Sequence, residues 1–269
     1  MFLKHPRPLH RLVEWAFHFC VLALVVSAGC TKPPAPPPTT SVVSEARRLL
    51  AERDRKLQTY RLEVTSTEGE RVARHTFAFR SPNKSRGHVL APQEVELAFD
   101  GQKLVRVLYG PSPDGGAPAK VNEPIPLDMG PTERVFFLAS TFMPFAPEGF
   151  RSPLIPMAGV EGRQLVRPGP GGGVPVEAYE VTVKPGQGVV VSYVLRASNG
   201  DFLEKRSNAD GRTRVLSVKR EQCDEKLGLC VPLELVETVV GDAGVEPLGT
   251  TVVTKAELNP ELPQDFFTP

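Results

Sequence analysis

The chain has 269 residues, which is the length of one large domain or two small ones. Its 32 lysine and arginine residues nearly balance 31 aspartate and glutamate residues. A nucleic-acid-binding protein needs a basic surface to neutralise phosphates, so this balance argues against a nucleic-acid partner and gives no sign of a polybasic membrane patch.

Residues 1–29 have the organisation of an export signal. Lys4, Arg7 and Arg11 form a positive start, residues 16–26 (AFHFCVLALVV) form an apolar segment, and small residues follow directly. A transmembrane helix is the alternative. It needs about 20 apolar residues, and this run is bounded by a glutamate before it and prolines after it. The sequence therefore predicts a signal peptide.

Cys30 follows Ser27, Ala28 and Gly29 in a pattern that resembles the lipobox of bacterial lipoproteins, although a large aliphatic residue is more usual than Ser27. The resemblance implies cleavage before Cys30 and lipidation of its sulfur, with membrane lipid as a partner. Two or three acyl chains anchor a protein far more firmly than one. Ordinary cleavage that leaves a free thiol is the alternative. Thr31 favours the outer membrane facing the periplasm, because aspartate there is the enterobacterial signal for inner-membrane retention.

Residues 30–40 are predicted to be the lipidated cysteine and a tether. Five of the ten residues 31–40 are proline. Such a segment is a semi-rigid spacer of about 3.1 Å per residue, so it reaches roughly 30 Å. Residues 41–269 remain for a single folded domain.

The domain is predicted to begin with a helix over residues 41–57, capped by Ser41 or Ser44. Its charged residues between 45 and 56 form pairs at helical spacing and are expected to face solvent. Its apolar stripe consists of Val43, Ala46, Leu49, Leu50 and Leu57.

From Tyr60 onward the apolar residues mostly alternate with polar ones, as in strands with one buried face. Short turn sequences join most of these segments, which favours antiparallel neighbours. The candidate strands are 60–66, 71–79, 94–99, 103–109, 162–167, 175–183, 188–197, 201–207, 212–222, 230–240 and 248–258. About ten or eleven strands predict an α+β fold in which a strongly curved, mostly antiparallel sheet forms an unclosed barrel around a few helices.

One segment, residues 131–150, breaks the strand pattern. Pro131 suits a helix start, Pro144 a helix stop, and five of the chain's 14 phenylalanines lie in this segment. A helix here could cover the apolar concave face of the sheet, although the same side chains could simply fill the core. The candidate residues for a lipid-binding cavity are Val135, Phe136, Phe137, Leu138, Phe142, Met143 and Phe145.

Cys223 and Cys230 flank six residues between two candidate strands. In an oxidising periplasm, cysteines so placed are expected to form a disulfide across a hairpin. A reduced redox pair or a metal ligand is the alternative, but a zinc site would need two more ligands at close spacing, and no such motif is present. We expect no metal and no cofactor.

Residues 79–111 and the C-terminal segment ELNPELPQDFFTP resemble the LolA/LolB family of periplasmic lipoprotein carriers and outer-membrane receptors. The matching positions are Arg80, Pro82, Pro92, Asp100, Gly101, Leu104 and Tyr109. The tryptophan or other aromatics expected near Gly87 and at Val105 are absent. The resemblance covers most of residues 41–269 and implies a curved sheet around helices with an apolar cavity for acyl chains.

The resemblance implies a non-enzymatic lipoprotein that binds an acyl chain or a lipoprotein cargo. An envelope sensing or protein-interaction module that does not use the cavity for lipid is the alternative. His75 and His88 are the only histidines after residue 30. Both are predicted to lie on strands and at the surface, and no nucleophile motif accompanies them. The oligomeric state is not encoded in any motif.

Overall fold

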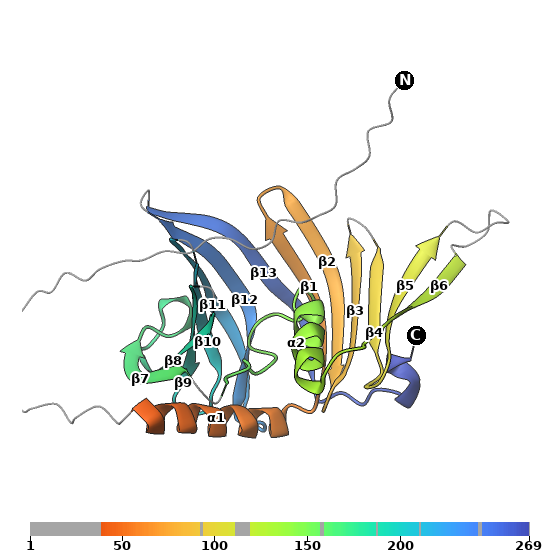
Figure 1. Ribbon diagram of the computed structural model, residues 1–269. Coiled ribbons are helices and arrows are strands. Elements are labelled where there is room, and N and C mark those ends of the chain that lie inside the picture. The colour runs from red at the N-terminus through yellow and green to blue at the C-terminus, as the bar shows by residue number, and fades with distance from the viewer. Residues whose placement is uncertain are drawn as a thin grey trace, which may run out of the picture.

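A computed structural model describes residues 39–268, apart from 92–93, 111–118, 157–158, 187, 210 and 242–243. The predicted signal peptide, Cys30 and the proline-rich residues that follow it lie outside the described residues. The described chain forms one broad, strongly curved sheet with two α-helices on its concave side (Figure 1).

The sheet has 13 strands, and every neighbouring pair is antiparallel. The strands are β1 (Thr59–Glu68), β2 (Arg71–Arg80), β3 (Lys84–Ala91), β4 (Val95–Phe99), β5 (Leu104–Gly110), β6 (Ala119–Ile125), β7 (Val160–Arg167), β8 (Val176–Gly186), β9 (Val189–Arg196), β10 (Phe202–Ala209), β11 (Arg212–Asp224), β12 (Leu229–Gly241) and β13 (Gly244–Leu258). Short 3₁₀ turns are η1 (Pro170–Gly172) and η2 (Gln264–Phe267).

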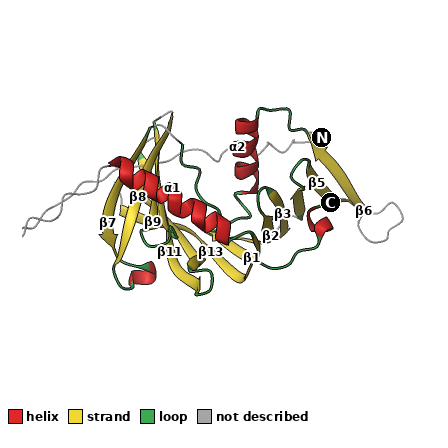
Figure 2. Cartoon of the chain, turned by 90° about the horizontal axis from the view of Figure 1, so that it is seen from below, coloured by secondary structure: helices red, strands yellow, loops and turns green. Residues whose placement is uncertain are grey.

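The strand order explains how the concave face becomes covered. It runs β6-β5-β4-β3-β2-β1-β13-β12-β11-β10-β9-β8-β7, so the first and last strands meet at the centre and the chain builds one wing on each side. β6 and β7 are the two edges, and the sheet stays unclosed. The segment that joins these edges crosses the concave side and contains the second helix, α2 (Pro131–Phe142) (Figures 1 and 2).

The predicted fold class is confirmed, and the apolar alternation missed two strands, β3 and β6, although the family resemblance implied a strand near Gly87. β3 carries Lys84, Arg86 and His88 at every second position, and β6 contains Pro124 among polar residues. Such sequences lack the apolar alternation that identifies a half-buried strand. Proline and charges are typical of edge strands such as β6, where they discourage pairing with another chain.

The first helix, α1 (Thr39–Lys56), begins two residues before the predicted start, within the predicted tether. Its apolar stripe is buried as expected, and Ala46 and Leu50 pack against Val181 and Leu195. The expectation that all charged residues of this helix face solvent is wrong for Arg53, which is 3% exposed. Neither helix of the described part is long and apolar enough to span a membrane.

The largest apolar cluster lies at the centre of the concave face, between the sheet and the chain from α2 to residue 150. It combines Tyr60, Leu62 and Phe77 of the sheet with Phe142 and Phe150. The predicted disulfide between Cys223 and Cys230 is present. It joins directly opposite residues of β11 and β12, whose Cα atoms are 3.9 Å apart. The disulfide crosses this hairpin next to its turn.

Candidate functional site

The candidate site is the region where α2 lies over the concave face. Pro131 starts the helix, and the Glu133 carboxylate accepts a hydrogen bond from the Gly130 backbone N–H at 3.1 Å. After Phe142 the chain turns, with the Phe145 and Ala146 N–H groups both donating to the Phe142 carbonyl. This turn directs Phe145 down into the sheet.

α2 is apolar on more than one side, and only its last residue, Phe142, is buried. Phe137 and Leu138 are half-buried and pack against the central cluster. Val135 is 52% exposed and Phe136 57% exposed, on the side that faces away from the cluster. A helix with apolar residues on both sides is unusual in water, because the outer side gains nothing from folding.

The structure therefore separates the seven predicted cavity residues into two groups. Phe142 and Phe145 are buried in the central cluster, and Phe137 and Leu138 flank it. The remaining three, Val135, Phe136 and Met143, are exposed, and Met143 is 60% exposed. The C-terminal end of α2 is thus held in the core, while its outer surface stays in solvent.

Phe142 and Phe145 are held by an aromatic platform on the sheet. The Phe142 ring centroid lies 6.0 Å from that of Phe77 and 6.2 Å from that of Phe145. Phe145 in turn meets the His75 ring edge-on at 6.0 Å. Aromatic contacts of this kind stabilise the fold beyond what the burial of the ring surfaces contributes. The last turn of α2 is therefore its strongest attachment to the sheet.

Gly87 on β3 provides the space for Phe145. A Cβ atom at residue 87 would lie 2.5 Å from the Cγ atom of Phe145. The family resemblance predicts an aromatic residue near Gly87, and none is present. The structure explains this absence, because the Phe145 ring from the α2 turn occupies the space. No spacing in the sequence links Gly87 to Phe145, so sequence analysis missed this contact.

His75 lies beneath the same turn and not at the surface, which corrects the sequence-based expectation. It is 4% exposed, and its Nε2 atom has no hydrogen-bond partner among the described residues. Burial lowers the pKa of His75, and a hydrogen bond with the Phe145 backbone opposes this shift. A charged imidazole would be costly here, so His75 stays neutral at neutral pH.

His88 of β3 lies on the opposite face of the sheet from His75, where it is half-buried. Its Nε2 atom is 2.9 Å from a Glu94 carboxylate oxygen, and its ring stacks on Tyr109 at a centroid distance of 5.9 Å. His88 pairs with Thr76, the neighbour of His75 on β2. Successive side chains of a strand point to opposite faces, so His75 and His88 do as well. The two histidines therefore cannot act on one substrate group.

The far end of the α2 crossover is held in place by buried and half-buried charged residues. Arg53 of α1 donates to the Gly149 carbonyl, and its Nε atom lies 3.4 Å from Asp201, which is itself buried. Lys205 of β10 pairs with Glu148. Burial raises the pKa of Asp201, although the Arg53 charge opposes this. These contacts fix residues 148–149 and leave the exposed part of α2 without such ties.

Comparisons with known proteins bear on this fold. No protein-family model matches the chain, and no curated protein matches its sequence. A DUF1329 family protein from Desulfovibrio piger has a similar structure, with a TM-score of 0.50, 13% identity and coverage of 86% of this chain and 97% of that one.

Two further solved structures are similar. One is a LolA superfamily protein from Nitrosomonas europaea, with a TM-score of 0.44, 14% identity and coverage of 83% of this chain and 97% of that one. The other is a putative outer membrane lipoprotein-sorting protein domain from Vibrio parahaemolyticus, with a TM-score of 0.48, 12% identity and the same coverage. The fold of this chain is similar to that of the Desulfovibrio piger protein, and at these identities the likeness concerns the fold alone.

Proposed function

We propose that this chain is a non-enzymatic lipoprotein of the cell envelope that binds an acyl chain, or the acylated end of a lipoprotein, between α2 and the concave face. In this proposal Cys30 carries the lipid that anchors the chain in the outer membrane, and the proline-rich segment separates the domain from the bilayer. The curved sheet, the central apolar helix and the resemblance of residues 79–111 to the LolA/LolB family support it.

The observation that carries the proposal is the loose seating of an apolar helix. Lifting α2 would expose the buried Phe142 and the half-buried Phe137 and Leu138, which pack against the central cluster, at a cost of roughly 3–6 kcal/mol. An acyl chain of about sixteen carbons gains at most roughly 12 kcal/mol at about 0.8 kcal/mol per buried CH₂. The binding free energy of the ligand can therefore offset the cost of opening α2. The exposed residues on the outer side of α2 add nothing to this cost, because they have no buried contacts to lose.

Photo-crosslinking in cells tests the proposal, because neighbouring residues of α2 face in different directions. A benzophenone amino acid at Phe137 reports on the space between helix and sheet, and one at Phe136 reports on the outside. Val174, which is 82% exposed in the β7–β8 loop, is the control position. We expect lipid adducts, identified by mass spectrometry, from position 137 well above the level at position 174.

The alternative function is an envelope sensing or protein-interaction module on the same fold. The filled aromatic cluster beneath Phe142 and the exposed Phe136 and Met143 favour it. In that case position 136 gives protein adducts, and position 137 gives no more lipid than position 174. This pattern would exclude acyl-chain binding beneath α2.

A further inference from the structure

The hairpin of β11 and β12 brings three potential metal ligands together. A carboxylate oxygen of Glu221 and the sulfur atoms of Cys223 and Cys230 all lie within 4.8 Å of one another. Cys223 and Cys230 are directly opposite across the hairpin, and Glu221 precedes Cys223 by two positions on the same strand face. No sequence motif pointed to a third ligand, because a cysteine and a glutamate two residues apart form no recognised zinc motif.

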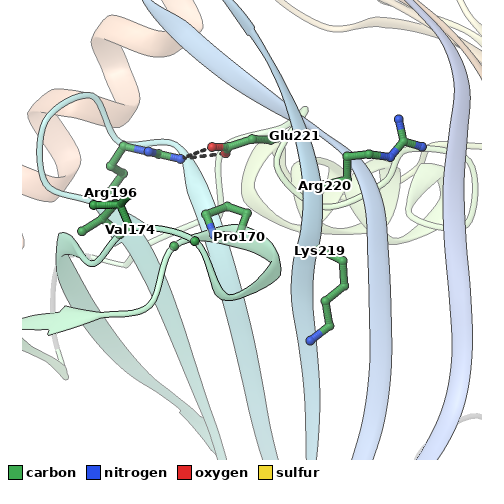
Figure 3. A pocket seen from close by; sticks show the side chains of 9 residues that line it. Pro170, Val174, Arg196, Lys219, Arg220 and Glu221 are labelled. Carbon is green, nitrogen blue, oxygen red and sulfur yellow. Dashed lines mark hydrogen bonds and ion pairs between the residues drawn. The ribbon is translucent and has the colours of Figure 1, made fainter.

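The carboxylate of this cluster is already oriented. One Arg196 nitrogen, Nη2, donates to both oxygens of Glu221, at 2.6 and 2.7 Å. Figure 3 shows the two side chains facing each other, while Arg220 points away from them. Carboxylates that bind metals are generally held by such an outer hydrogen-bond partner. The Cys230 backbone is fixed as well, since its N–H donates to the buried Asp201 at 2.8 Å.

An open groove of about 410 Å³ adjoins the cluster. Pro170 and Val174 of the β7–β8 loop line it together with Arg196, Lys219 and Glu221 (Figure 3). The groove gives solvent access to Glu221. Cys223 is exposed as well, whereas Cys230 is buried.

From this arrangement we infer that the hairpin is a redox-gated site for a thiophilic divalent cation such as Zn²⁺. A dithiol reductant transfers two electrons and two protons to the disulfide, which yields two protein thiols and leaves the reductant as a disulfide. The cation then displaces both thiol protons to solvent and binds the two thiolates and Glu221. Three protein ligands leave the fourth tetrahedral position for water or for a ligand in the groove.

The dependence of metal binding on the redox state follows from the charges of the three ligands. In the disulfide form the sulfur atoms carry no negative charge, and the Glu221 carboxylate is neutralised by Arg196. In the dithiol form two thiolates and Glu221 supply three negative charges against two on the cation, and Arg196 balances the remainder. Affinity should rise with pH, because metal binding releases protons.

Cobalt titration of the full-length protein tests the inference. The protein is reduced with a dithiol, freed from the reductant under argon and titrated with Co²⁺. We expect one Co²⁺ per chain, with thiolate-to-cobalt absorption in the near ultraviolet and the visible bands of a tetrahedral site. Oxidised protein and the Cys223→Ser/Cys230→Ser variant should show neither. The double variant also accounts for binding by any other thiol of the chain.

A matched pair of variants tests the third ligand. Glu221→Gln should weaken Co²⁺ binding about tenfold or more, whereas Glu225→Gln, in the exposed turn of the same hairpin, should not. Equal affinities for these two variants would overturn the site, as would reduced protein that binds no more Co²⁺ than the double serine variant. Protection of both cysteines from alkylation by Zn²⁺ in reduced wild-type protein provides a second measurement that needs no variant, and its absence would also overturn the inference.

Discussion

The contact between Phe145 and Gly87 predicts a strong energetic coupling that a double-mutant cycle can measure. An alanine Cβ at residue 87 would lie 2.5, 2.7 and 2.8 Å from the Cγ, Cδ1 and Cδ2 atoms of Phe145, so the ring must move. Forced repacking of this kind costs about 1–3 kcal/mol. Phe145→Ala alone should cost about 3–5 kcal/mol, because it leaves a cavity beneath the α2 turn.

In the Phe145→Ala background the same Gly87→Ala change meets no ring. It should then be neutral or stabilise the protein by about 0.5–1 kcal/mol, since glycine is unfavourable within a strand. The coupling free energy is therefore expected to be about 2 kcal/mol. It is measured by urea unfolding of the four proteins, with Phe136→Ala, an exposed helix position, as a control that should change stability by less than about 0.5 kcal/mol. Equal costs of Gly87→Ala in both backgrounds would refute the reasoning.

Three further predictions concern His75, the pair of Arg53 and Asp201, and the disulfide. Because burial lowers the pKa of His75 in the folded state, the unfolded state binds more protons as the pH drops through the ordinary histidine pKa. The contribution of His75 to stability should be complete above about pH 6.5 and be lost below it. His75→Phe should flatten this part of the urea-unfolding profile, and an unchanged profile would contradict the burial of a neutral His75. Asp201→Ala should cost about 3–5 kcal/mol in thermal unfolding because Arg53 stays buried without its partner, and a loss below 1 kcal/mol would contradict the buried pair. Breaking the disulfide with Cys223→Ser/Cys230→Ser should cost about 2–3 kcal/mol for so short a loop, and unchanged unfolding by urea would show that the bond does not constrain the unfolded chain.

Much of the fold could be predicted because its signals are local. The apolar stripe of α1, the alternation of most strands and the position of Pro131 each depend on residues close in sequence. The disulfide also followed from local spacing, combined with the expected compartment. Predicting these features requires only the periodicity of apolar residues in helices and strands and the residue preferences of helix ends and turns.

The candidate site was harder to predict, because its decisive contacts join distant segments. α2 is apolar on both sides, so helical periodicity could not tell that Phe142 is buried while Phe136 is exposed. His75 looks like any polar residue on a strand until the α2 turn covers it. Arg53 sits in a run of charged residues, and only the position of Asp201, far along the chain, makes its burial favourable.

The pairing of β1 with β13 has a consequence for how the protein is made. The chain is synthesised from its N-terminus, so the edge of β1 that pairs with β13 stays unpaired until almost the last residues have been made. An open strand edge in a half-made sheet is a template for aggregation, and contacts between the two ends of a chain form slowly. Biogenesis of this protein therefore has its most vulnerable interval before β13 arrives, and a chain truncated ahead of Gly244 should be degraded or aggregate instead of folding into two separate halves.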